Sequence, residues 1–174
     1  DNLHFDISKL DQWNIVLAHA QAKGLFLHFV LNEAEAANKR ELDNATLGVE
    51  RKLYYREIIA RFGHHNALQW NLCEEYNLNL PIEPEVIKEF ARYVKAVDPY
   101  DHPITVHNTG NTYISAFSSF MGDDLFGAIS MQVWQKPDDI GYATEYLRSR
   151  TSAAGKPLPC SVDESIGIDQ LPFD

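Results

Sequence analysis

The chain has 174 residues, enough for one ordinary domain, of which 45% are hydrophobic and 23% are charged. This composition is typical of a globular protein with a buried core, and no stretch reaches the roughly 20 apolar residues of a membrane span. Its 15 basic and 25 acidic residues give a net charge of −10, which disfavours nucleic acid as a partner. Two cysteines, Cys73 and Cys160, are too few for a disulfide-rich fold or a four-cysteine zinc site, and their apolar neighbours indicate inert thiols.

Helical and strand-like segments alternate along the chain. In chain order we predict a helix over 7–23, a strand over 25–31, a helix over 53–62, a strand over 67–73, a helix over 85–97, a strand over 103–107, a short helix near 114–120, a strand over 125–133, a helix over 138–151 and a strand over 158–163. Gly24 is placed to end the first helix, and Pro84 to open the third. Trp13 and Trp70 are expected in the core.

This alternation predicts an α/β fold with a parallel sheet, in one domain over residues 1–174. The predicted strands recur about every 33 residues, and eight such units would make a typical (β/α)8 barrel of about 250 residues. The chain contains neither the G-x-G-x-x-G motif nor a P-loop, which disfavours a nucleotide-binding sheet. We therefore expect a partial (β/α)8 TIM barrel.

Polar side chains follow the ends of the predicted strands. They are Glu33, Glu74, Glu75, His107, Trp134 and Glu164. In a parallel barrel these ends share the face that carries active sites. Glu75 and Glu164 are 89 positions apart, about three units, so their strands should face each other across the barrel mouth. Two converging carboxylates suit glycoside hydrolysis, although either group could instead cap a helix or pair with a basic residue.

Two of these strand ends carry a family resemblance. Residues 70–77 (WNLCEEYN) resemble the fourth-strand signature of clan A, cellulase-like retaining glycoside hydrolases, and residues 159–167 (PCSVDESIG) resemble their seventh-strand signature. Residues 53–65 are similar to the helix before strand 4 in such enzymes. The resemblance covers strands 3 to 7 of a TIM barrel. It implies that Glu75 is the acid/base, with Glu74 as the alternative, and that Glu164 is the nucleophile. Glu74 stands at a position where the family has Asn.

The resemblance also implies a poly- or oligosaccharide substrate, no cofactor, no metal, and secretion or a periplasmic location. The substrate-binding residues that it implies are Glu74, His107, Trp134, Tyr76 and Asn77. Five strands leave both sheet edges open, so we expect the isolated chain to be inactive, and either to associate with itself through those edges or to have them covered. We expect no membrane or nucleic-acid partner.

Two other hypotheses for the function remain open from the sequence. A metal-dependent hydrolase on the same barrel would use His28, His107 and carboxylates, although the chain has no H-E-x-x-H motif. A carbohydrate-binding or degenerate barrel would have lost its acid site when Glu replaced Asn at position 74.

Overall fold

The computed structural model describes residues 2–134 and 137–165. Its strands are β1 (Leu27–Val30), β2 (Leu68–Asn71), β3 (Ile104–Thr105), β4 (Ile129–Val133) and β5 (Cys160–Ser165). Its helices are α1 (Ile7–Ala22), α2 (Ala36–Glu41), α3 (Val49–Phe62), α4 (Pro84–Val97), α5 (Tyr113–Ser118) and α6 (Pro137–Ala153), with a 3-10 turn, η1, at Asp43–Ala45. The alternation of helices and strands is as predicted. None of the helices described here is both long enough and apolar enough to cross a membrane.

The five strands are parallel and follow one another in chain order across the sheet. β1 pairs with β2 and β2 with β3, while β4 pairs with β5. A single parallel bridge between His107 and Ser130 joins the two groups. Beyond that bridge the side-chain amide of Asn108 substitutes for the backbone ladder, because its Nδ2 donates to the carbonyl of Gln132 and its Oδ1 accepts from the Gln132 amide. The end of β3 is thereby held against β4.

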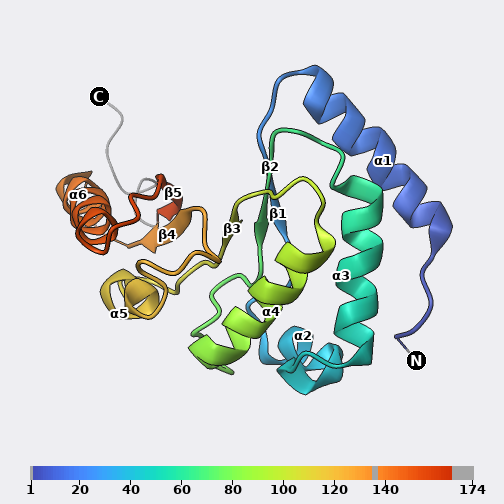
Figure 1. The fold of residues 1–174 in the computed structure, drawn as a ribbon, viewed down its shortest axis with the longest axis horizontal. Helices are drawn as coiled ribbons and strands as arrows, with labels where there is room; N and C mark the ends of the chain where they lie inside the picture. The colour runs from blue at the N-terminus through green and yellow to red at the C-terminus, as the bar shows by residue number, and fades with distance from the viewer. Residues whose placement is uncertain (1, 135–136, 166–174) are drawn as a thin grey trace.

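The helices cover one side of this sheet. α1, α3 and α4 lie beside β1 to β3, and α5 and α6 lie beside β4 and β5 (Figure 1). The largest side chains of the core lie between α3, α4 and β2, and include Tyr55, Phe62, Trp70 and Phe90. Trp70 is fully buried, as predicted. The opposite side of the sheet carries polar side chains, among them His28, Gln69 and Asp163.

Helix α1 differs from its prediction in one respect. Asp6 caps it by accepting hydrogen bonds from the Ser8 and Lys9 amides, and Gly24 ends it with a φ of 72°. Leu10 and Leu17 face the core, but Trp13 is 53% exposed, so its expected core position is wrong. The helix is apolar around much of its circumference, and contacts with α3 and β1 cover only one side.

A buried polar cluster supports the amino-terminal end of the sheet. Asp98, which follows α4, accepts hydrogen bonds from Trp70 Nε1 at 2.9 Å and from the amides of Tyr100 and His102. The Nδ1 atom of His102 lies 2.8 Å from the same carboxylate, and its Nε2 lies 3.1 Å from the carbonyl of His65. Burial alone would raise the pKa of Asp98, but these hydrogen bonds outweigh it and lower the pKa. The Asp98 carboxylate, the Trp70 indole nitrogen and both ring nitrogens of His102 therefore all have partners, whereas the neighbouring His65 Nε2 is buried without a hydrogen bond.

Candidate active site

Three side chains from different strands meet at the opposite, carboxyl-terminal end of the sheet. Glu74 follows β2, His107 follows β3, and Glu164 lies in β5 opposite Gln132 of β4. One oxygen of each glutamate and one ring nitrogen of His107 all lie within 4.8 Å of one another. The parallel strands cause this convergence, because residues distant in sequence reach the same edge at the ends of their strands.

The Glu74 side chain is held from two directions. Asn71, the last residue of β2, donates from Nδ2 to Glu74 Oε2 at 2.8 Å. The other oxygen, Oε1, lies 2.7 Å from His107 Nδ1. The backbone amide of Glu74 also donates to the carbonyl of Asn32, which follows β1, at 2.8 Å. The side chain is 25% exposed, so its orientation is fixed while solvent still reaches it.

His107 is the least satisfied polar residue of the site. Its ring is fully buried, and neither ring nitrogen makes a hydrogen bond within the part of the chain that the structure describes. The 2.7 Å approach to Glu74 is short, but it lacks the alignment of a hydrogen bond. Since buried polar atoms are nearly always paired, this arrangement indicates that His107 has a role other than holding the fold together.

The side chain of Glu75 makes different contacts from that of Glu74. The regular strand ends at Asn71, and Glu75 has a φ of 39°, so strand alternation does not decide where the two adjacent side chains point. Its Oε1 accepts a 2.9 Å hydrogen bond from Thr109 Oγ1, in the loop after β3. Glu75 is therefore tied to this loop, whereas Glu74 is the strand-end carboxylate found with Glu164 and His107.

A buried lysine anchors the loop that carries both glutamates. Lys39 of α2 donates from Nζ to the carbonyls of Glu75, Tyr76 and Leu78, at 2.9, 3.4 and 2.6 Å. Burial lowers the pKa of this amine, and the three carbonyl dipoles compensate part of its lost hydration. The sequence places Lys39 in a polar stretch that resembles an ordinary surface loop, so no pattern there indicates this role.

A buried arginine supports the same region from α3. Arg51 donates from Nη1 to Asn32 Oδ1 at 3.1 Å and from Nη2 to the carbonyls of Lys39 and Leu42. Its guanidinium also lies over the ring of Phe90, 4.6 Å from the ring centroid. Because Asn32 in turn accepts from the Glu74 amide, Arg51 and Lys39 together hold the backbone on which the site is built.

The side chains of Tyr76 and Asn77 form hydrogen bonds to the segment that follows β3. Tyr76 is buried, and its hydroxyl donates to the carbonyl of Ala116 at 2.7 Å. Burial raises the pKa of this hydroxyl to about 12. Asn77 donates to Thr112 Oγ1 and accepts from the Thr109 amide, so both ends of its amide are used. Tyr76 is thus committed to the core, whereas partly exposed Asn77 keeps a second amide hydrogen beyond these two bonds.

Trp134 lies at the same edge, directly after β4. It is 46% exposed, and its backbone amide donates to Asn111 Oδ1 at 2.8 Å. Gly110 has a φ of 50°, and a Cβ on it would lie 3.6 Å from the Trp134 ring, so the indole packs along this loop. An exposed indole beside the acidic cluster is the kind of surface on which a sugar ring stacks.

His28 lies deeper on the polar side of the sheet and belongs to a separate group. Its Nδ1 lies 2.6 Å from Gln69 Nε2 and 3.5 Å from Asp163 Oδ2, and Asp163 also accepts a hydrogen bond from Ser130. Burial lowers the pKa of His28, against the opposing effect of the Asp163 carboxylate. His28 does not join Glu74, His107 and Glu164 among the described residues that could share one ligand.

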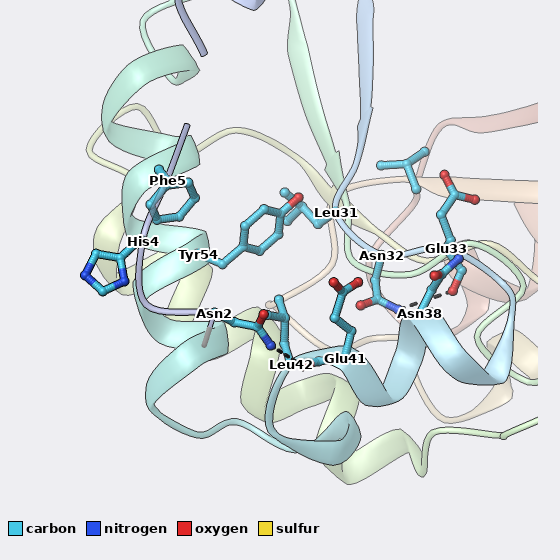
Figure 2. A pocket seen from close by; sticks show the side chains of 11 residues that line it. Asn2, His4, Phe5, Leu31, Asn32, Glu33, Asn38, Glu41, Leu42 and Tyr54 are labelled. Atoms are coloured by element: carbon cyan, nitrogen blue, oxygen red, sulfur yellow. Dashed lines mark hydrogen bonds between the residues drawn. The ribbon is translucent and has the colours of Figure 1, made fainter. Parts of the chain in front are cut away.

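A pocket of about 450 Å³ opens beside the site, at the free edge of the sheet. Figure 2 shows Leu31 and Asn32 at the end of β1, Tyr54 of α3 and Glu41 of α2 around it. Asn2 closes one side by donating from Nδ2 to the carbonyl of Glu41 at 2.8 Å. The pocket shares Asn32 with the network under Glu74, so it borders the site directly.

No family model matches the chain, and no curated protein matches it in sequence. Solved structures do match. A candidate glycoside hydrolase from Bacteroides vulgatus ATCC 8482 superposes with a TM-score of 0.69 and 19% identity, over 89% of this chain and 28% of its own. A glycoside hydrolase family 5 protein from the same bacterium gives a TM-score of 0.63 and 13% identity, over 90% of this chain and 34% of its own.

The chain has the fold of part of a TIM-barrel glycoside hydrolase. It spans about a third of the length of these two proteins or less. The expected α/β fold, with parallel strands alternating with helices, is therefore confirmed, and so is the likeness to glycoside hydrolases. At identities of 19% and 13% the likeness establishes the fold alone.

Proposed function

We propose that this chain carries the two-carboxylate centre of a retaining glycoside hydrolase, with Glu74 and Glu164 as the reacting pair and an oligo- or polysaccharide as substrate. One observation carries the proposal: the two carboxylates, from strands on facing parts of the sheet, approach within 4.8 Å at the end where barrel enzymes bind substrate. The fold likeness supports the same class of reaction.

The short separation favours retention of configuration. Inverting enzymes hold their carboxyl groups about 6.5–9.5 Å apart to admit a water molecule, whereas retaining enzymes hold them about 5–5.5 Å apart. The 4.8 Å limit on the nearest atoms of Glu74 and Glu164 agrees with the second class. At this separation either oxygen can approach a sugar bound beside the pair, so direct attack by one carboxylate is the proposed course.

The surroundings of the two groups suggest their roles. Glu164 is exposed and free to approach a sugar, so it is the proposed nucleophile. It attacks the anomeric carbon while Glu74 protonates the departing glycosidic oxygen, and the glycosidic C–O bond breaks. Water then attacks the glycosyl ester, Glu74 accepts its proton, and Glu164 leaves as a carboxylate.

Asn71 and His107 position Glu74 in this scheme, and Trp134 provides the stacking surface for a sugar ring. Glu75 is the alternative acid/base, because the family resemblance aligns it with that role and its hydrogen bond to Thr109 keeps it close to the end of β3. The two assignments differ only in which adjacent residue transfers the proton.

Glu→Gln variants of the full-length protein separate these roles. Glu164→Gln and Glu74→Gln should each lower kcat by about 10²-fold or more on aryl glycosides, while Glu75→Gln should retain more activity. Glu145→Gln, on the exposed surface of α6, is the matched control and should match the wild type. Azide should rescue Glu164→Ala and yield a glycosyl azide of inverted configuration.

Two results would change the proposal. A Glu75→Gln variant less active than Glu74→Gln would transfer the acid/base role to Glu75. Sugar binding without hydrolysis in the wild type would instead favour a carbohydrate-binding barrel.

A further inference from the structure

We propose that Glu74, His107 and Glu164 also form a binding site for a single Zn²⁺ ion, and that Zn²⁺ bound there blocks the site. Binding depends only on the three side chains and their geometry. The blocking effect rests on the proposed glycosidase function, since it matters only if the two carboxylates carry the reaction.

The first observation in favour of a metal site is that His107 lacks hydrogen bonds. Both of its ring nitrogens are buried and lack hydrogen bonds within the described part of the chain. The ring faces two carboxylates rather than donors, because Glu74 Oε1 lies 2.7 Å from Nδ1 and Glu164 completes the cluster. A cation at this point would give the imidazole lone pair a partner and would neutralise two adjacent negative charges.

The second support is the chemistry of the three ligands. One imidazole and two carboxylates form a mixed nitrogen and oxygen set, which Zn²⁺ accepts readily. Mg²⁺ and Ca²⁺ favour oxygen ligands alone, so His107 selects against them. Asn71 holds Glu74 Oε2 at 2.8 Å, as outer partners commonly hold the carboxylates that bind a metal.

The geometry requires two small adjustments. Zn–N and Zn–O bonds of about 2.0–2.2 Å place tetrahedral ligand atoms about 3.4 Å apart. The ligand atoms of this cluster lie up to 4.8 Å apart, so at least one must move by about 1 Å. Glu164 is exposed and can make this movement by rotating its side chain. The 2.7 Å contact between Glu74 Oε1 and His107 Nδ1 must also widen to about 3.4 Å, which a small rotation of the partly exposed Glu74 carboxylate provides.

Bound Zn²⁺ would occupy oxygens of both glutamates. Glu164 could not then attack an anomeric carbon, and Glu74 could not hold the proton that the leaving group needs. A sugar and Zn²⁺ would therefore exclude one another, and inhibition would be competitive with substrate.

Calorimetric titration of the full-length protein with ZnCl₂ at pH 7 tests the site. We expect about one Zn²⁺ per chain, no binding of MgCl₂ at the same concentrations, and at least tenfold weaker Zn²⁺ binding by Glu164→Gln. Glu164 is exposed, so this variant should fold even if replacement of buried His107 does not. Glu145→Gln is the control and should bind Zn²⁺ as the wild type does. No Zn²⁺ binding, or equal binding by Glu164→Gln and Glu145→Gln, would overturn the proposal.

Activity with and without a chelator separates this inference from the proposed function. Activity in EDTA that Zn²⁺ competitively suppresses supports both. Zn²⁺ binding by a protein that hydrolyses no glycoside in EDTA supports the metal site and counts against the glycosidase. Activity that requires Zn²⁺ would overturn the inhibitory role and would favour a metal-dependent hydrolase.

Discussion

Two buried histidines at opposite ends of this sheet, His102 and His107, differ in how their ring nitrogens are paired. At the amino-terminal end, Asp98 accepts hydrogen bonds from Trp70 and His102, and both ring nitrogens of His102 face oxygen atoms. At the carboxyl-terminal end, the ring of His107 is just as buried and has no hydrogen bond within the described residues, and two carboxylates crowd beside it.

This contrast distinguishes a structural cluster from a functional one. A buried polar group stabilises a fold only when its partners replace the water that it loses, and the Asp98 cluster meets that condition. The His107 cluster does not meet it, so its polar groups cost stability in the free protein. Functional sites keep such groups because a ligand or a transition state supplies the missing partner.

Removing the Asp98 charge should produce the largest loss of stability. Asp98→Asn leaves donors from Trp70, Tyr100 and His102 facing a neutral amide, and it should lower the free energy of unfolding by about 3 kcal/mol. Urea denaturation at pH 7 measures the change. Asp101→Asn is the matched control, because Asp101 is exposed and Asn tolerates its φ of 55°, so its effect should stay within about 0.5 kcal/mol.

The same pair of variants has a predicted pH dependence. The pKa of Asp98 is lowered below its usual value of 3.8, so its contribution is present above that pH and is lost as the pH falls through the folded value. The stability difference between wild type and Asp98→Asn should therefore shrink below about pH 4. A difference that stayed constant down to pH 2 would contradict the assignment.

Removing the lysine that anchors the site loop should have a smaller effect on stability and a distinct effect on activity. Lys39→Met keeps much of the side-chain volume but leaves the carbonyls of Glu75, Tyr76 and Leu78 without their donor. We expect about 2 kcal/mol of destabilisation and a lower kcat, because the loop that carries Glu74 loses its anchor. Lys23→Met, on the exposed end of α1, should change neither thermal denaturation nor turnover.

Replacing His107 should change the free energy of unfolding least. The sign of that change, compared with the change in a His102 variant, tests the contrast between the two histidines. His107→Leu removes a buried ring that makes no hydrogen bond, and the partly exposed Glu74 that it contacts keeps its bond to Asn71. The free energy of unfolding should therefore stay unchanged or rise by about 1 kcal/mol while activity falls. His102→Leu, in the paired cluster, should instead cost about 2 kcal/mol. Equal losses in the two variants, measured by urea denaturation, would remove the distinction between the two ends.

The fold could be predicted because its signals are local and repeated. Strands β1 and β4 are short, mostly apolar runs, and residues such as Gly24 and Pro84 end or begin helices through their own backbone preferences. Parallel order then brings the strand ends to one edge, so the meeting of Glu164 with a β2 carboxylate also follows from the pattern. Trp13 was misplaced because helical spacing does not indicate how much of a helix its neighbours cover.

Finer features of the site depend on tertiary contacts that no local pattern encodes. Glu74, not Glu75, lies with Glu164, and Glu75 has a left-handed φ that nothing in the residue types around it indicates. Tyr76 resembles a cleft residue in sequence, yet its hydroxyl reaches Ala116 on a distant helix. Burial of Lys39 depends on three carbonyls that exist only after the loop has folded.

The smallest predicted effect concerns the reactivity of the two cysteines. Their labelling rates test how tightly the residues around the site are packed. Cys73 directly precedes Glu74 and is fully buried, and burial raises the pKa of its thiol to about 11. At pH 8 only about one such thiol in a thousand is ionised, so Cys73 should react with a disulfide reagent far more slowly than half-buried Cys160. Labelling of Cys160→Ser and Cys73→Ser should therefore show one slow and one faster thiol in the native protein. Urea should remove the difference between the two labelling rates. Fast labelling of Cys73 in the native protein would contradict the prediction, because it would mean that the loop under Glu74 opens far more readily than its anchors at Lys39 and Asn32 allow.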